Sequence, residues 1–440
     1  IDFDKIAEEN KAQAAFGSTD IFASSRNAHE WYGLLSTIKT NLSDDLVLSG
    51  GVDARYYVGS HWYEVADLLG GQFYVNDTND ENTSGQALKV GDRFNKDYDG
   101  IVVRGGLFAQ AEYSPSADLS IFLASAISNT TYSKNEFMYY APTDPARESD
   151  KVDFLGYSVK GGANYNLSDT RNVFVNIGYF SKAPFLDGNV FQSDSSTDFN
   201  EGALNEKVFS AEIGYGFRGD KLSANINIYN TSWIDKSLTG SVDDPDNQGD
   251  RVNYNIAGLD ALHQGVEVDF VYRASDMITF TGMASIGNWK WKNDASGKLF
   301  DEGGQIIKSV DVYAKDLRVS DAAQTTFALG SKFKLMEKTS FYIDYNYASD
   351  LYASYRITDR GDETNRQDSW EMPAYGLFDL GLNHGFNIGQ FDASLSARMN
   401  NVLNTEYISD ARDGAGSIAQ TAGVYYGAGR TFSLGIKLNF

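Results

Sequence analysis

Four histidines, His29, His61, His263 and His384, are the only imidazole side chains in the chain. A hydrolytic site would need one of them beside a serine and an acidic residue, because the nucleophile is activated by an adjacent base. No serine, histidine and carboxylate stand together at a recognisable spacing. Cysteine is absent, which removes thiol nucleophiles, thiolate metal ligands and disulfides. The sequence therefore predicts that the protein is not an enzyme.

Two acidic stretches, residues 76–82 (NDTNDEN) and 243–250 (DDPDNQGD), are rich in the carboxylate and amide oxygens that Ca²⁺ prefers. Neither matches the spacing of a helix–loop–helix calcium site. Turns stabilised by Asp and Asn side chains explain the same composition without a metal. We therefore expect no metal and no cofactor, and calcium in these loops stays an open alternative.

Aromatic side chains in the polar segments are the better candidates for binding a ligand. An aromatic face offers a large contact area together with, for Tyr and Trp, a polar group at its edge. The alternative is that these rings pack the loops against one another. The candidates are Trp62, Tyr63, Phe73, Tyr74, Tyr139, Tyr140, Phe185, Trp370, Tyr425 and Tyr426.

The composition limits the class of protein that presents these residues. The chain has 440 residues, a net charge of −23 and 14 % aromatic residues. Such an acidic chain repels nucleic acid. No apolar run approaches the roughly 18 residues that a membrane helix requires. A helical membrane protein and a nucleic-acid-binding protein are therefore both excluded.

Alternation of apolar and polar residues is the dominant pattern. In 172–179, for example, Val173, Val175, Ile177 and Tyr179 share one face of a strand. Short turns rich in Asp, Ser, Gly and Asn alternate strictly with long polar connections. The short turns are 42–45, 114–118, 167–170, 218–221, 273–276, 336–338 and 387–390, and the long connections are 64–98, 133–151, 183–205, 236–256, 291–322, 350–373 and 405–428. Antiparallel hairpins with all tight turns at one end give this order.

An aromatic residue on the apolar face precedes nearly every short turn. Such a band marks a membrane–water interface of a transmembrane β-barrel. These residues are Tyr113, Tyr165, Phe217, Tyr272, Phe333 and Phe386. A second band is expected near the opposite end, formed by Tyr179, Trp233, Trp289 and Tyr347. The polar face should line the lumen with charges of both signs: Arg104, Glu112, Lys160, Glu212, Glu267, Asp269, Lys332, Asp344, Asp379 and Arg398.

The pattern predicts an all-β fold, a transmembrane antiparallel β-barrel with about 15 strands in this chain. Single-chain bacterial barrels have even strand numbers, so an odd count does not by itself give a closed barrel. Closure is obligatory in lipid, since an open edge leaves backbone groups without hydrogen bonds. At least one strand is therefore expected elsewhere. We expect residues 1–30 to form an extracellular loop segment and 31–440, starting with an inward-running strand at Trp31, to form the C-terminal part of the barrel.

Four segments resemble the TonB-dependent outer-membrane receptors, particularly those of Bacteroidota-like bacteria. They are 204–214 (LNEKVFSAEIG), 178–184 (GYFSKAP), 399–410 (MNNVLNTEYISD) and 429–440 (GRTFSLGIKLNF). The resemblance implies a 22-stranded barrel with a plugged lumen. It also implies that the terminal strand is the signal read by the barrel-assembly machinery. The residues of that signal are Phe432, Leu434, Ile436, Leu438 and Phe440.

The function implied by the resemblance is energised uptake of a scarce nutrient across the outer membrane of a Gram-negative bacterium. The ligand would be an iron chelate, haem, cobalamin, a glycan or a peptide. The expected partners are the lipid bilayer, an inner-membrane energy-coupling protein, a possible surface lipoprotein, and a plug with the first seven strands on another chain or fragment. A passive channel and a structural or surface-assembly component with a receptor-like barrel remain alternatives.

Overall fold

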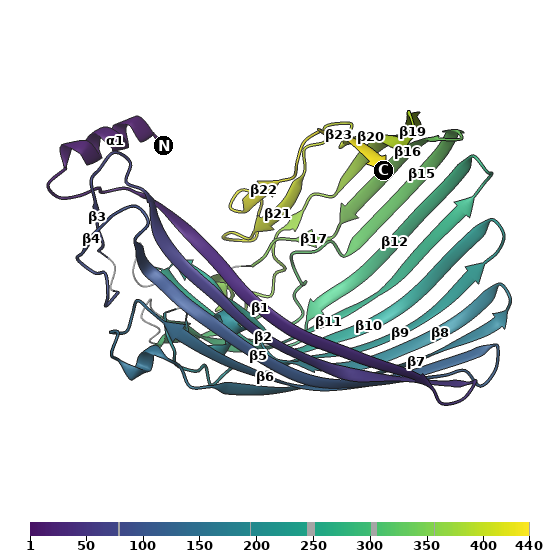
Figure 1. Cartoon of the computed structure of the whole chain (residues 1–440), viewed down its shortest axis with the longest axis horizontal. Helices are drawn as coiled ribbons and strands as arrows, with labels where there is room; N and C mark the ends of the chain where they lie inside the picture. The colour runs from purple at the N-terminus through teal and green to yellow at the C-terminus, as the bar shows by residue number, and fades with distance from the viewer. Residues whose placement is uncertain (78–79, 194, 244–250, 301–305, 356, 440) are drawn as a thin grey trace.

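One large antiparallel sheet dominates the computed structural model, which describes residues 1–440 except 78–79, 194, 244–250, 301–305, 356 and 440. The sheet contains 17 strands and curves into a trough whose two long edges lie apart (Figure 1). Its strands are β1 (Phe22–Asn41), β2 (Leu46–Asp67), β5 (Arg93–Tyr113), β6 (Leu119–Glu136), β7 (Val152–Ser168), β8 (Arg171–Lys182), β9 (Glu206–Arg218), β10 (Leu222–Asp243), β11 (Arg251–Arg273), β12 (Ile278–Trp291), β13 (Ala295–Phe300), β14 (Ile306–Val312), β15 (Thr325–Met336), β16 (Thr339–Ser349), β19 (Tyr375–Ile388), β20 (Phe391–Asn400) and β23 (Thr431–Asn439).

Short elements lie in the segment before β1 and in the long connections, which gather at the end of the trough opposite the tight turns (Figure 1). They are the α-helix α1 (Phe3–Ala12), the single turns η1 (Pro145–Arg147), η2 (Leu186–Val190) and η3 (Ile357–Arg360), and the strand pairs β3 (Tyr74–Val75) with β4 (Ala87–Leu88), β17 (Leu351–Tyr352) with β18 (Glu371–Met372), and β21 (Ile408–Arg412) with β22 (Gly423–Tyr426). We call this end of the trough the loop end.

The strand count confirms the sequence-based prediction. Of the 17 strands, β13 and β14 form a hairpin that pairs with the loop-end part of β11, which leaves fifteen that follow one another across the wall. Each of the fifteen pairs antiparallel with its neighbour in chain order, from β1 with β2 through to β20 with β23. Tight turns join alternate pairs at the end away from the loops (Figure 1).

Two faces of opposite character result from the alternation of side chains. Large apolar side chains stand exposed on one face; Leu107 is 60 % exposed and Ile286 is 64 % exposed. The predicted lumenal charges occupy the alternate positions, such as Arg104 opposite Thr130 and Asp344 opposite Asp379. Because a continuous face of exposed isoleucine, leucine and valine is favourable against an apolar solvent and unfavourable against water, the first face suits lipid and the second suits the lumen.

Both edges of the sheet are unpaired among the described residues. β1 forms a ladder with β2 alone, and β23 forms a ladder with β20 alone. Four of the predicted insertion-signal residues, Phe432, Leu434, Ile436 and Leu438, lie exposed on the apolar face of β23. The fifth, Phe440, lies outside the described residues, so its role stays a prediction.

The first strand begins at Phe22 rather than at Trp31, which corrects the expected boundary. Its early part pairs with β2 from Phe22 opposite Asp67 onward, and Arg26 forms an ion pair with Glu64 at 2.8 Å. This part is polar on both faces, so alternation gave no sign of a strand. Upstream, α1 is anchored by Asn10, whose side-chain amide donates to the carbonyl oxygens of Asp20, Leu68 and Leu69. The placement of residues 1–30 outside the cell stays a prediction.

Two tryptophans of the expected second aromatic band point the other way. Trp233 shares its face with Asn227 and Tyr229, and the Trp289 indole donates to the Tyr229 hydroxyl at 2.9 Å. Both therefore lie on the polar face, and the prediction was wrong for them. The cause is that Trp233 packs against a loop-end apolar cluster instead of lipid. Tyr179 and Tyr347 do lie on the apolar face, opposite Val159 and Phe327.

Among the described residues, no helix is both long and apolar enough to cross a membrane.

The direction of the strands can be checked with single cysteines, since the chain has none of its own. Asp169 is exposed in a tight turn and Glu363 is exposed in a long connection. We expect a membrane-impermeant maleimide added to intact cells to label Glu363→Cys and to leave Asp169→Cys unlabelled until the cells are opened. Equal labelling of both from outside would contradict the topology.

Candidate ligand-binding cavity

A cavity of about 140 Å³ lies at the loop end, where several separate strands converge. We call it the loop-end cavity. Its lining comes from β2, β5, β6, β11 and two long connections, and consists of Tyr63, Asn95, Lys96, Glu136, Tyr139, Ser195 and Asn253. Drug-sized ligands occupy pockets of about 300–1,000 Å³. This cavity therefore suits a single ring-sized group or the tip of a larger ligand.

Asn95 and Tyr139 form one wall of the loop-end cavity. The Tyr139 hydroxyl donates to Asn95 Oδ1 at 2.6 Å. Asn95 has a left-handed backbone with φ of 61°, a conformation that Asn tolerates better than most residues. Its backbone N–H donates to Asp80 Oδ2 at 3.0 Å, which ties β5 to the preceding turn of the first long connection. Backbone conformation and tyrosine together fix the Asn95 amide at the cavity.

Two buried charged residues, Lys134 and Glu136, bond to the backbone of the connections around the cavity. Lys134 and Glu136 are each only 1 % exposed, and their i, i+2 spacing puts them on one face of β6. Glu136 Oε2 accepts from the backbone N–H groups of Met138 and Tyr139 at 3.0 and 2.6 Å. Lys134 Nζ donates to the carbonyl oxygens of Ser193 and Ser196 at 3.0 and 3.1 Å. Buried charges require such partners, and here the partners fix the connection 183–205 over the sheet.

The lining has no net formal charge, because one lysine is balanced by one glutamate. Lys96 Nζ stands 5.8 Å from the centre of the Tyr63 ring and 5.3 Å from that of Tyr98. The remaining lining groups are hydroxyls and amides, which both donate and accept hydrogen bonds. Among the described residues, histidine does not line this cavity, so the lining offers no imidazole base of the kind that activates a nucleophile. The arrangement is therefore suited to binding a neutral, hydrogen-bonding group.

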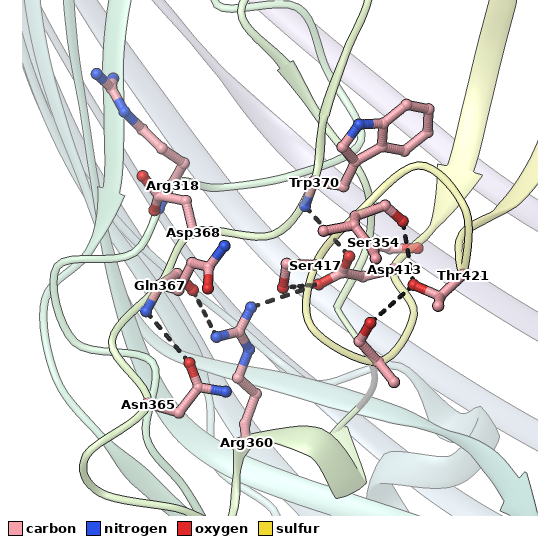
Figure 2. Close-up of polar contacts among 12 residues, drawn as sticks. Arg318, Ser354, Arg360, Asn365, Gln367, Asp368, Trp370, Asp413, Ser417 and Thr421 are labelled. Carbon is pink, nitrogen blue, oxygen red and sulfur yellow. Dashed lines mark hydrogen bonds and ion pairs between the residues drawn. The ribbon is translucent and has the colours of Figure 1, made fainter.

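A second cluster, which we call the loop clasp, joins the connection 350–374 to the connection 401–430 (Figure 2). Arg360 and Asp413, 2 % and 6 % exposed, form an ion pair at 3.7 Å. Arg360 Nη1 donates to the carbonyl oxygen of Gln367 at 2.7 Å. Asp413 also accepts from the Ser417 hydroxyl at 2.7 Å and from the Trp370 backbone N–H at 3.2 Å. These bonds hold two connections as one unit.

A third connection, 292–324, joins the same unit. Arg366 makes two bonds to the carboxylate of Asp294, at 2.6 and 3.0 Å, and the Tyr313 N–H donates to the Arg360 carbonyl. The hydrogen bond from Arg366 is the main reason that the pKa of Asp294 lies below its ordinary value. Because the pKa of Asp294 is lowered in the folded state, this ion pair stabilises the fold fully at pH values above the ordinary carboxyl pKa. That stabilisation is lost as the pH falls through the lowered pKa.

Tyr355 connects the loop clasp to the apolar cluster beneath it. Its ring lies edge-on to Trp291, with centroids 6.4 Å apart, and 5.5 Å from the Arg360 guanidinium. Burial raises the pKa of the Tyr355 hydroxyl well above its usual range. The cluster packs Trp291 with Ile256, Leu259 and Leu317, so β11 and β12 support the loops directly.

The structure brings two of the ten aromatic candidates, Tyr63 and Tyr139, to the loop-end cavity. Tyr140 lies close by, with its hydroxyl at 3.5 Å from the backbone N–H of Thr197. The Arg93 guanidinium lies over the Trp62 ring, 4.2 Å from the ring centre. The Ser18 backbone N–H donates to the carbonyl oxygen of Phe73. Tyr74 packs against Phe94.

The other four candidates lie away from the cavity. Trp370 packs against an apolar cluster around Leu351 and Met372. Phe185 is 67 % exposed with Lys182 over its ring, and Tyr425 and Tyr426 are exposed on β22. A ligand-binding role for all ten stays a prediction.

Lys96, Lys134, Glu136 and the two asparagines were not identified from the sequence. The run Lys134-x-Glu136 at the end of an alternating segment was the available signal, since charges two apart on a strand share a face. Asn253 could not be found in this way, because only the long β10–β11 ribbon brings it to β5 and β6.

The first acidic stretch, 76–82, forms a turn where it is described, and of the second only Asp243, the last residue of β10, is described. Asp80 is buried and accepts from Thr83 and from the side chain of Asn76. Burial alone would raise its pKa, but these bonds and the one from Asn95 bring the pKa of Asp80 below its ordinary value. No group of three or more His, Asp or Glu residues that could hold a metal occurs in the described part of the chain. Residues 78–79 and 244–250 lie outside that part.

Solved structures of several transporters share this fold. The copper transporter OprC matches with a TM-score of 0.66 and 14 % identity, over 94 % of this chain and 59 % of that one. The ferric citrate transporter FecA in the unliganded form matches with a TM-score of 0.60 and 14 % identity, over 95 % of this chain and 55 % of that one. The ferric yersiniabactin uptake receptor FyuA from Yersinia pestis matches with a TM-score of 0.59 and 11 % identity, over 95 % of this chain and 56 % of that one. This chain thus spans little more than half the length of each.

No curated protein matches the chain. The family model described as TonB dependent receptor-like, beta-barrel matches residues 5–402. That match covers most of the wall, including both faces and the loop-end cavity. The family is one of outer-membrane transport barrels and not of enzymes, as the sequence predicted. The chain therefore belongs to the TonB-dependent receptor β-barrel family of the Gram-negative outer membrane.

Proposed function

We propose that the chain forms the larger part of the wall of an outer-membrane receptor that takes up a scarce nutrient with energy supplied from the inner membrane. The observation that supports this most strongly is a fifteen-strand wall with a polar inner face and two unpaired edges. An unpaired edge in lipid costs several kcal/mol per backbone group. Further strands, together with a plug for the lumen, would complete the barrel.

The partners follow from this proposal. A plug and seven further strands, outside residues 1–440, complete the barrel, and the strands pair with β1 on one side and β23 on the other. An inner-membrane energy-coupling protein moves the plug, and a surface lipoprotein is a further candidate at the loop end. The mixed charges of the inner wall suit a polar plug, because both signs find partners there.

The chemistry of the loop-end cavity bears on the ligand. Among iron chelates, haem, cobalamin, glycans and peptides, the cavity favours a neutral polar group of the kind that glycans and peptide backbones carry. Its lining offers one balanced pair of charges with five neutral hydrogen-bonding residues. The relatives OprC, FyuA and FecA are described as handling copper, ferric yersiniabactin and ferric citrate.

Transport separates this proposal from its alternatives. The purified receptor should give no persistent conductance in a planar bilayer, because a plug occupies the lumen. Cells should accumulate fluorescent maltoheptaose or radiolabelled ferric citrate only when the energy-coupling protein is present. Persistent conductance with uptake independent of that protein would establish a passive channel. Neither conductance nor coupled uptake of any probe from the five ligand classes would indicate a surface-assembly component.

A further inference from the structure

Two adjacent rows of side chains cross the lipid-facing surface of β8 to β12. The register places Val175, Ile213, Ile228, Val266 and Ile286 opposite one another in a single apolar row. Two residues nearer the loop end, a second row runs across β9 to β12, and its members are Ala211, Asn230, Gln264 and Asn288. The surface therefore changes within one step from aliphatic to amide side chains, as expected where hydrocarbon meets lipid head groups.

A hollow of about 560 Å³ lies over this boundary and is lined by both rows. We call it the lipid-face hollow. Ala211 is the smallest side chain in the two rows, and it stands between Ile177 on β8 and Asn230 on β10. The short side chain leaves the space that a larger residue would fill. The bottom of the hollow is aliphatic and its loop-end rim is polar.

Two cations lie just beyond the residues that line the hollow, on the loop-end side of Asn288. Arg318 Nη1 reaches Asn288 Oδ1 at 3.0 Å and Gln324 Oε1 at 3.1 Å, and both acceptors are neutral amides. Lys290 lies two residues beyond Asn288 on the same face, and a β-bridge pairs its backbone with that of Arg318. Neither cation forms an ion pair with a carboxylate of the described residues. Positive charge at this depth is thus available to an anionic head group.

We propose that the lipid-face hollow is a specific site for an outer-leaflet lipid that has an anionic head group. One acyl chain lies over the row from Val175 to Ile286, where it packs against aliphatic side chains by van der Waals contact. The head group accepts hydrogen bonds from Arg318, Lys290 and the Asn230 and Gln264 amides. Charge complementarity selects an anionic lipid over a zwitterionic one. The inference rests on the placement in the outer membrane and does not depend on what the receptor transports.

Native mass spectrometry of the whole purified receptor can test the site. Dimyristoyl phosphatidylglycerol and dimyristoyl phosphatidylcholine have the same chains and differ in head-group charge. We expect the receptor to retain the anionic lipid about five- to tenfold more strongly, from two charge-assisted contacts. The Lys290→Gln/Arg318→Gln variant should bring that ratio close to one. Ala211→Phe, which fills the hollow, should reduce retention of both lipids.

Matched variants on the same surface serve as controls. Ala224→Phe places the same ring on the lipid face near the tight turns, and Lys221→Gln removes a cation from a tight turn. Neither should change lipid retention. If the double variant folds poorly, Lys290→Gln alone should still lower the ratio, since its side chain has no ion pair with the described residues. Equal retention of both lipids by the native receptor, or an unchanged ratio in the variants that lack Lys290, would overturn the proposal.

Discussion

Ile226→Arg is expected to destabilise the folded receptor in lipid by about 2–4 kcal/mol, the cost of an arginine at mid-membrane on a barrel's outer face. Ile226 lies between Tyr215 and Val268 on the apolar face of β10. Its neighbour Asn227 lies opposite Gly214 and Glu267 on the polar face. Asn227→Arg should therefore cost about 1 kcal/mol at most, because the guanidinium meets water and carboxylate there.

Reversible denaturant unfolding of the receptor in lipid vesicles measures both costs. The pair is a matched control, since the same residue is introduced at adjacent positions of one strand. Equal destabilisation by the two substitutions would show that the two faces are wrongly assigned.

Removal of one partner of the loop clasp should free two connections at once. Asp413→Ala leaves Arg360 buried without its carboxylate, and breaking a buried ion pair in this way costs about 3–5 kcal/mol. Most of that cost should appear as local opening of the loop end, because the wall is held by its own ladders. Hydrogen exchange of the Ser354 and Asp413 amides, which bond to Ala411 and Ser354 carbonyls, reports that opening.

A double variant separates the ion pair from simple loss of packing. Arg360→Met/Asp413→Leu removes both charges and keeps similar volume, so it should recover much of the protection lost in Asp413→Ala. Exchange at the Ile226 amide should be the same in all three proteins. Unchanged exchange at Ser354 in Asp413→Ala would show that the clasp does not hold the connections together.

The transmembrane wall was predictable from sequence because lipid imposes a strict rule on it. Each strand there needs one apolar face, so period-2 alternation appears in the residues and fixes both the strands and their faces. Ile226, Val268 and Ile286 all lie on the predicted side. The tight turns were equally readable, since they require Asp, Asn, Gly or Ser at defined positions.

Beyond the hydrocarbon that rule no longer applies, and the predictions failed there. The sequence predicts a polar connection over 236–256, but the ribbon of β10 and β11 continues there with Thr239 opposite Asn255. Alternation does not reveal this part of the ribbon, because both of its faces are polar or packed by loops. Trp233 and Trp289 were assigned to an interfacial band from their residue type, although their phase in the alternation puts them on the polar face. Alternation was the better guide, since an aromatic ring is equally stable against a folded loop.

The loop-end cavity could not have been assembled from sequence. Its members Tyr63, Asn95, Glu136 and Asn253 come from four strands, and their meeting depends on how far each strand extends past the membrane. Those lengths are set by loop packing, such as the bonds of Lys134 to the connection 183–205. No local pattern records contacts of this kind.

If this wall is one part of a larger closed barrel, its two edges must lie far apart in the complete receptor. Spin labels at Ser36 on β1 and Ser433 on β23 can be placed in the complete receptor in lipid. Paired strands bring Cα atoms to about 5 Å, whereas seven intervening strands spaced about 4.8 Å apart put the edges on the order of 30 Å from each other. Dipolar spectroscopy should give the long distance. Strong short-range broadening, which places β1 beside β23, would contradict the account.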